Sequence, residues 1–156
     1  MKISQGVEWG LHCATLLALA PPGQAVRRDR LAGHYGLPEA YLAKHLQAMA
    51  RAGVLHAVPG PRGGYRLARD AATITVLDVV EAVEGGGSPF VCQEIRQRGT
   101  GALPPEQCRR TCAIHATMTA ADTAWRASLR AVTIAELVDQ LPTAVRERNV
   151  RLMAER

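Results

Sequence analysis

The stretch that decides the fold is PEAYLAKHLQAMARAGVLHAVPGPRGGYRL, residues 38–67. Leu42, Leu46 and Met49 recur at the three- and four-residue steps of one helix face, so we expect a helix over about residues 38–52. The glycine that follows supplies the left-handed turn with which helices commonly end. Residues 54–58 and 65–67 read as two strands, and the Pro- and Gly-rich loop between them predicts a tight hairpin with a basic tip.

Two further helices are expected upstream of this stretch. Apolar residues at helical spacing over 7–18 predict the first helix, which the prolines and glycine at 21–23 end. Leu31 and Tyr35 mark a short second helix, and Gly36 permits the turn into the third. Three helices followed by a hairpin predict a mainly α fold with a small β-hairpin wing, the winged helix-turn-helix. In that fold the third helix enters the major groove of DNA, and the wing reaches the backbone or the minor groove.

The second half of the chain is expected to be helical as well. A capping box formed by Thr75 and Asp78 predicts a fourth helix, which a run of three glycines ends. A long helical pattern covers about residues 106–131, with a narrow apolar seam of the kind that packs on another helix. A short helix is expected over 133–140, and the tail after it is helical or disordered.

Charge is distributed unevenly along the chain, whose formal net charge is +5. Residues 27–69 hold eight Lys and Arg against two Asp and Glu, whereas residues 70–94 hold five acidic residues and no basic ones. A basic block of this kind is typical of a module that binds a polyanion, although an Arg-rich composition alone can also produce it. The sequence has no phosphate-binding glycine loop and no recognisable nucleophile with its base, so we do not expect an enzyme.

The longest apolar run, residues 13–20, is far shorter than the roughly 20 residues of a membrane-spanning helix. A short secretory signal is the alternative interpretation of this run. Glu8 and His12 before it, and two prolines after it, instead favour the first helix of a soluble domain. We therefore expect a cytoplasmic protein.

The candidate DNA contacts lie on the third helix and on the wing. Polar side chains on that helix can face bases or phosphates, and glycines in the wing loop allow close approach to a duplex. The alternative is a helical bundle with a surface hairpin, on which the same residues are merely solvated. The candidates are Pro38, Tyr41, Lys44, His45, Gln47, Arg62, Gly63, Gly64 and Tyr65.

Four segments together resemble the Rrf2 family of bacterial transcription regulators, of the IscR and NsrR type. They are YLAKHL (41–46), AGVL (52–55), GPRGGYRLA (60–68) and LDVVEAVEG (77–85). The resemblance covers nearly the whole chain and implies a homodimer that binds pseudo-palindromic double-stranded promoter DNA. It also implies long helices that cross at the dimer interface and, in many members, an iron-sulfur cluster as sensor. The expected organisation is a winged-helix domain (1–87), a loop next to the cysteines (88–103), a long dimerisation helix with a short helix (104–141) and a tail (142–156).

Two pairs of residues have the chemistry of metal ligands. Cys108 and Cys112 are four apart at the predicted start of the long helix, so both thiolates would face one way and could bind one iron of a cluster. Glu8 and His12 are also four apart and share a face of the first helix. Carboxylate and imidazole can both bind iron, although such a pair is otherwise an ordinary solvated face.

Three segments resemble the redox-sensing RsrR type within this family: GVEWGLHC (6–13), FVCQEIRQRG (90–99) and PPEQC (104–108). The resemblance implies a 2Fe-2S cluster held across the dimer interface. Its ligands would be Cys108 and Cys112 of one chain and Glu8 and His12 of the other. Trp9 would be a redox relay that changes position with the state of the cluster.

Alternative roles for the cysteines remain open. Cys92, Cys108, Cys112 and His115 of a single chain are the main rival ligand set, which suits a cluster or tetrahedral zinc. Fifteen residues separate the first two cysteines of this set, whereas IscR-like members have three cysteines at short spacing. A thiol switch without metal, or a cluster-free regulator whose second half binds a partner protein, are further alternatives. Cys13 is expected to be a buried free thiol.

Overall fold

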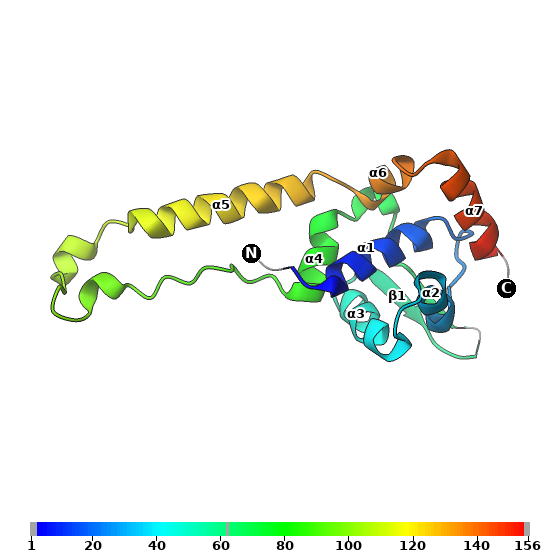
Figure 1. Cartoon of the computed structure of the whole chain (residues 1–156), viewed down its shortest axis with the longest axis horizontal. Helices are drawn as coiled ribbons and strands as arrows, with labels where there is room; N and C mark the ends of the chain where they lie inside the picture. Colours follow the sequence, from blue (N-terminus) through cyan, green and yellow to red (C-terminus); the bar gives the residue numbers. More distant parts are fainter. Residues whose placement is uncertain (1–2, 62, 155–156) are drawn as a thin grey trace. The chain divides into compact units, whose positions relative to one another are not determined.

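The computed structural model describes residues 3–61 and 63–154 (Figure 1). The described part is mainly helical with one two-stranded antiparallel hairpin, so the predicted fold class is confirmed. None of its helices is both long and apolar enough to cross a bilayer. Its elements in chain order are α1 (Gln5–Ala18), α2 (Arg28–Tyr35), α3 (Glu39–Arg51), β1 (Leu55–Val58), β2 (Gly64–Leu67), η1 (Ala71–Thr73), α4 (Val76–Glu84), η2 (Ile95–Gln97), η3 (Pro105–Cys108), α5 (Ala113–Arg130), α6 (Ile134–Asp139) and α7 (Thr143–Ala154).

The chain divides into two compact units. Among the described residues, the winged-helix unit consists of 3–61, 63–86 and 129–154, and the cysteine unit consists of 87–128. Helices α6 and α7 therefore belong with the N-terminal elements, although α5 stands between them in the sequence.

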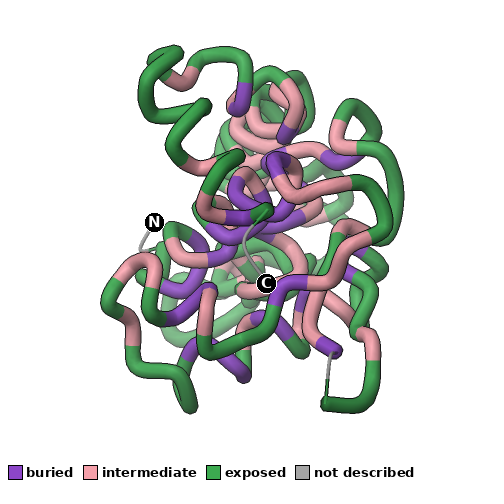
Figure 2. The backbone as a smooth tube through the Cα atoms, turned by 90° about the vertical axis from the view of Figure 1, so that its right-hand side faces the viewer, coloured by how far each residue is buried: buried purple, intermediate pink, exposed green. Residues whose placement is uncertain are grey.

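The core of the winged-helix unit is apolar, and no polar or charged residue among those described is buried. Buried and exposed segments alternate along the tube in Figure 2, as expected where each helix turns one face inward. Burying one such side chain contributes about 1.5–3 kcal/mol. The largest fully buried side chains include Leu16, Leu31, Leu42, Leu46, Met49, Leu55, Ile74, Ile134 and Met153.

The helix-turn-helix is built by local signals. Helix α2 ends at Tyr35, its C-cap Gly36 has a left-handed φ of 63°, and Pro38 is the N-cap of α3. The predicted capping box at α4 is confirmed, because Asp78 N–H donates to the Thr75 hydroxyl at 3.1 Å and the Thr75 N–H donates to the Asp78 carboxylate at 2.8 Å.

The wing is anchored to the segment that precedes α2. Leu55 pairs with Leu67 at the base of the hairpin and Val58 pairs with Gly64 near its tip. Val26 and Tyr65 exchange two backbone hydrogen bonds of 2.9 Å each. Main-chain bonds thus fix the approach of the wing to the segment before α2, and the lack of a side chain at Gly64 leaves room for it.

The C-terminal residues complete the same core. Val76 N–H donates to the Val132 carbonyl, and Ile134 N–H donates to the Ile74 carbonyl, each at 2.8 Å. The tail is helical over α7, and Met153 is fully buried in the core. Gln24 Nε2 donates to the Met153 carbonyl at 2.9 Å, which ties the end of α7 to the loop after α1.

In the cysteine unit the long helix begins later than the predicted residue 106. A short 3-10 helix ends at Cys108, residues 109–112 are not helical, and α5 begins at Ala113. In a continuous helix the carbonyls of Cys108 and Arg110 would accept backbone N–H groups. Here they accept hydrogen bonds from Arg96 Nη2 instead, at 3.4 and 3.2 Å. The expectation that both cysteines lie on the start of one helix is therefore wrong.

Candidate nucleic-acid interface and cysteine site

Helix α3 presents an exposed polar face opposite its buried one. Tyr41, Lys44 and Gln47 are three residues apart and all exposed, and the Tyr41 residue is 59% accessible. Leu42 and Leu46 are fully buried on the other side of the helix. The three exposed residues are placed as a groove-reading helix requires. Pro38, at the N-cap, is also exposed.

His45, expected to face DNA, is half-buried against α1. Its ring lies edge-on to Trp9 and Tyr41, with centroids 6.0 and 5.5 Å away. Its Nε2 atom is buried and accepts or donates no hydrogen bond among the described residues. Burial, followed by the charge of Lys44, lowers the pKa of His45. In this structure His45 joins helix α3 to helix α1.

Contacts inside the protein explain why glycine stands at positions 63 and 64 of the wing. A Cβ at Gly63 would overlap the Val58 carbonyl oxygen, and one at Gly64 would overlap the carbonyl oxygen of Val26. Close approach of backbone within the wing at Gly63, and to the segment before α2 at Gly64, thus accounts for both glycines without reference to DNA. Tyr65 is half-buried on β2. Arg62, the predicted wing-tip contact, lies outside the described residues.

Glu8 and His12 are both exposed on helix α1. The centroid of the His12 ring lies 5.2 Å from that of the Tyr35 ring. Among the described residues, neither the Glu8 carboxylate nor the His12 imidazole forms a hydrogen bond. Between them Trp9 is half-buried, with its ring edge-on to Tyr41 at 5.9 Å. The pair is free to bind a group from outside the unit, while Trp9 contacts the predicted recognition helix.

Cys112 stands directly before α5, at a position that favours its thiolate. The backbone N–H groups of His115 and Ile114 donate toward its sulfur and lower its pKa, and the charge of Arg96 acts in the same direction. Cys13 differs from Cys112 in burial and in the direction of its pKa shift. It is fully buried, as expected, and burial raises the pKa of its thiol to about 12.

An ion pair that the sequence did not indicate holds the cysteine loop together. Glu94 binds the Arg96 guanidinium through both oxygens, at 2.6 and 2.7 Å. Arg96 in turn donates to the carbonyls of Cys108 and Arg110. Among the described residues Glu94 is the non-glycine with a left-handed backbone, at φ 47°. Backbone strain of this kind persists where surrounding contacts over-determine it, and it concentrates at functional sites.

Cys92, Cys112 and His115 line one cavity of about 230 Å³. The His115 Nδ1 atom is buried and has no hydrogen-bond partner among the described residues. Cys108 does not line this cavity, so the structure does not bring the four members of the one-chain set together. Within the described ranges no group of three or more His, Cys, Asp or Glu is arranged to hold a metal ion. In the cross-dimer set, Glu8 and His12 belong to the winged-helix unit, and Cys108 and Cys112 belong to the cysteine unit.

The fold and sequence match known regulators. Residues 3–140 match the model of the Rrf2 family, described as an iron-dependent transcriptional regulator. The putative HTH-type transcriptional regulator YwgB of Bacillus subtilis is 25% identical over 142 residues, which are 90% of this chain and 86% of that protein.

Two solved structures of regulators share the fold. The global cysteine regulator CymR of B. subtilis superposes with a TM-score of 0.70 at 22% identity, over 91% of this chain and 99% of that one. The IscR structure from T. potens superposes with a TM-score of 0.67 at 22% identity, over 92% and 90% of the two chains. The chain therefore belongs to the Rrf2 family, whose members are DNA-binding transcription regulators and not enzymes.

Proposed function

We propose that this regulator is a homodimer that binds promoter DNA in the cytoplasm and responds to redox state through a 2Fe-2S cluster. Cys108 and Cys112 of one chain and Glu8 and His12 of the other would hold the cluster across the dimer interface. The observation that carries the proposal is the exposed Glu8 and His12 pair, whose side chains have the chemistry of iron ligands and no hydrogen-bond partner among the described residues. Neither pair alone completes the four ligands of such a cluster, so each needs the other.

The donor set fits the group chemically. Thiolate ligands must be deprotonated, and the contacts around Cys112 favour that form. A carboxylate and a neutral imidazole are established iron ligands, and both are solvent-accessible here. When bound, the cluster supplies a one-electron couple, and imidazole in place of thiolate raises its reduction potential.

Helix α1 connects the proposed ligands to the DNA-reading surface. Its exposed side carries Glu8 and His12, and Trp9 between them packs on Tyr41 of α3. A displacement of α1 at the ligand pair would reach α3 through the contacts of Trp9 with Tyr41 and His45, which is the relay role proposed for Trp9. The two α3 helices of a dimer must lie about 34–36 Å apart to enter successive major grooves, so small displacements change affinity.

Helix α5 supports the proposed homodimer. None of its 18 residues is buried in the single chain. Ile114 and Met118 are exposed on it, at 66% and 40% accessibility. Apolar side chains on a long unburied helix favour packing on a second copy.

Metal analysis of anaerobically purified protein tests the proposal. We expect two irons and two sulfides per cluster, and a paramagnetic resonance signal that appears on one-electron reduction with dithionite. Glu8→Ala and His12→Ala should each change the absorption spectrum, whereas Glu147→Ala, at an exposed site on α7, should not. Loss of the spectrum on replacement of Cys92 or His115, with no change on replacement of Glu8 or His12, would assign the ligands to the one-chain set, and zinc in place of iron would contradict the proposal.

One observation favours a second function, a thiol switch without metal. Cys92 and Cys112 line the same cavity, and the pKa of Cys112 is lowered. An oxidant such as a peroxide would take two electrons as the two thiols lose their protons and form a disulfide. Peptide mapping of metal-free, peroxide-treated protein would detect a bridge between these two cysteines.

A further inference from the structure

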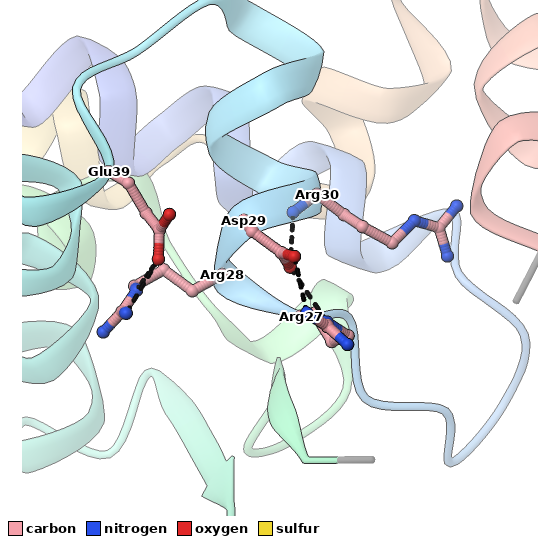
Figure 3. Close-up of polar contacts among 5 residues, drawn as sticks. All are labelled: Arg27, Arg28, Asp29, Arg30 and Glu39. Carbon is pink, nitrogen blue, oxygen red and sulfur yellow. Dashed lines mark hydrogen bonds and ion pairs between the residues drawn. The ribbon is translucent and has the colours of Figure 1, made fainter. Parts of the chain in front are cut away.

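The start of the helix-turn-helix carries two adjacent arginines, each held by a carboxylate (Figure 3). Arg27 binds Asp29 through two bonds, with Nε 3.0 Å from Oδ1 and Nη2 2.6 Å from Oδ2. Arg28 binds Glu39 Oε1 through Nε and Nη2, each at 2.7 Å. In Figure 3 the two guanidinium groups leave the chain on either side of Asp29.

All four side chains remain accessible to a large ligand. Their exposed fractions are 59% and 45% for Arg27 and Asp29, and 46% and 44% for Arg28 and Glu39. Neither pair is screened from a macromolecule that approaches this surface.

The position of these pairs coincides with the surface that DNA must approach. Arg28 is the first residue of α2 and Glu39 is the first residue of α3, so one ion pair links the starts of both helices of the motif. The four residues also line one surface cavity of about 550 Å³ together with the wing residues Ala57, Val58, Gly60, Pro61, Gly63, Gly64 and Tyr65. In helix-turn-helix complexes the helix before the recognition helix crosses the phosphate backbone.

We propose that Arg27 and Arg28 form a site for the DNA backbone, which Asp29 and Glu39 occupy in the free protein and vacate when DNA binds. The inference rests on DNA binding by this family. It adds that two carboxylates of the protein itself compete with DNA phosphates for these arginines. Phosphate is the matching ligand, because a planar guanidinium binds phosphate and carboxylate with the same forked geometry.

The exchange favours DNA for a physical reason. Exposed ion pairs are weak and favour the closed form by only about two- to fivefold. An arginine that reaches a phosphate also releases condensed counterions, so its gain grows as salt is lowered. The carboxylates therefore weaken binding to every duplex, because each must be displaced whatever the base sequence is. The fold-change is the same for an operator and for any other duplex, so the carboxylates lower affinity without changing the preferred sequence.

Fluorescence anisotropy with a labelled 30-base-pair duplex of random sequence, over a salt series, tests the inference. Asp29→Asn and Glu39→Gln should each tighten binding about two- to fivefold at fixed salt. Arg28→Gln should weaken binding and lower the salt slope by about 1. Asp139→Asn is the matched control: it removes the partner of Arg146 in an exposed pair between α6 and α7 and causes the same change in net charge.

A double variant separates exchange from simple repulsion of DNA by Glu39. If the carboxylate acts by occupying Arg28, Glu39→Gln should give no gain in the Arg28→Gln background. A gain that persists there, or an equal gain from Asp139→Asn, would overturn the inference while leaving DNA binding intact. If the folded wild-type dimer binds no duplex even at low salt, DNA binding itself fails, and the inference fails with it. Circular dichroism of each variant confirms that its fold is unchanged.

Discussion

The imidazole of His45 lies against the backbone of Gly6, so closely that a Cβ at position 6 would overlap the ring. Helix α3 thus approaches α1 at Gly6, one of the two glycines of α1, and a Cβ at the other, Gly10, would lie 3.1 Å from the Met49 sulfur of α3. Because His45 has no hydrogen bond at its buried Nε2, packing alone holds the ring there. We interpret His45 as a residue that positions the recognition helix.

Gly6→Ala should therefore displace α3. We expect a loss of about 1–3 kcal/mol in unfolding free energy, the usual cost of overpacking. Duplex affinity should fall as well, because the three exposed residues of α3 move with the helix. Urea unfolding and anisotropy titration measure the two effects. Gly33→Ala in α2, where a Cβ meets nothing within 4 Å, is the control and should keep or raise stability. Equal losses at both positions would show that the His45 contact has no special role.

The stability of the protein should fall as pH drops below about 6.5. The pKa of His45 is lowered from 6.5 by burial and by Lys44, with Glu84 opposing, and burial also lowers that of His34. The unfolded chain therefore binds these protons more readily than the folded one. The stabilisation is fully present above pH 6.5 and is lost as pH falls through the lower folded values.

His45→Gln should narrow the difference between urea unfolding free energies measured at pH 7.5 and pH 5. His56→Gln, in the exposed hairpin, is the control and should leave that difference unchanged. If the two variants behave alike, titration of His45 is not linked to folding.

Much of the fold was predictable because its signals are local. The boundaries of α1, α3, α4 and the hairpin follow from apolar periodicity and from glycine, proline and capping residues next to each element. The start of α5 was not predictable in this way. Arg96 binds two carbonyls in the segment before α5, and it lies 12 and 14 residues before them in the sequence. Periodicity carries no information about such a contact.

In the candidate site, too, features set by local sequence were predictable and features set by long-range contacts were not. Tyr41, Lys44 and Gln47 are exposed as their helical positions predict, because nothing in the unit covers that face. His45 occupies a similar polar position in the sequence pattern, yet α1 covers it. Which polar residue of α3 is covered depends on where another helix crosses it, and that is a tertiary property.

Arg96→Gln should loosen the cysteine loop. The variant removes the donor to the Cys108 and Arg110 carbonyls and the partner of Glu94. We expect hydrogen exchange over residues 105–112 of the metal-free protein to accelerate about three- to tenfold, because an internal hydrogen bond contributes about 1 kcal/mol. Arg98→Gln, an exposed arginine in the same segment, is the control. Unchanged exchange in Arg96→Gln would mean that the loop is ordered by other contacts.

The wing and helix α3 should respond differently to substitution if they have the roles proposed for them. Arg62→Gln should weaken binding to all duplexes alike and lower the salt slope by about 1, as loss of a phosphate contact does. Gln47→Ala should instead change which bases are preferred, by about 1–3 kcal/mol at the position it reads. Selection from a random duplex library, followed by anisotropy titration of the selected and a scrambled sequence, measures both effects. Arg148→Gln on α7 serves as the charge control for Arg62. A uniform loss from Gln47→Ala would show that this residue positions the helix without reading bases, and a change of preference from Arg62→Gln would place the wing among the base-reading elements.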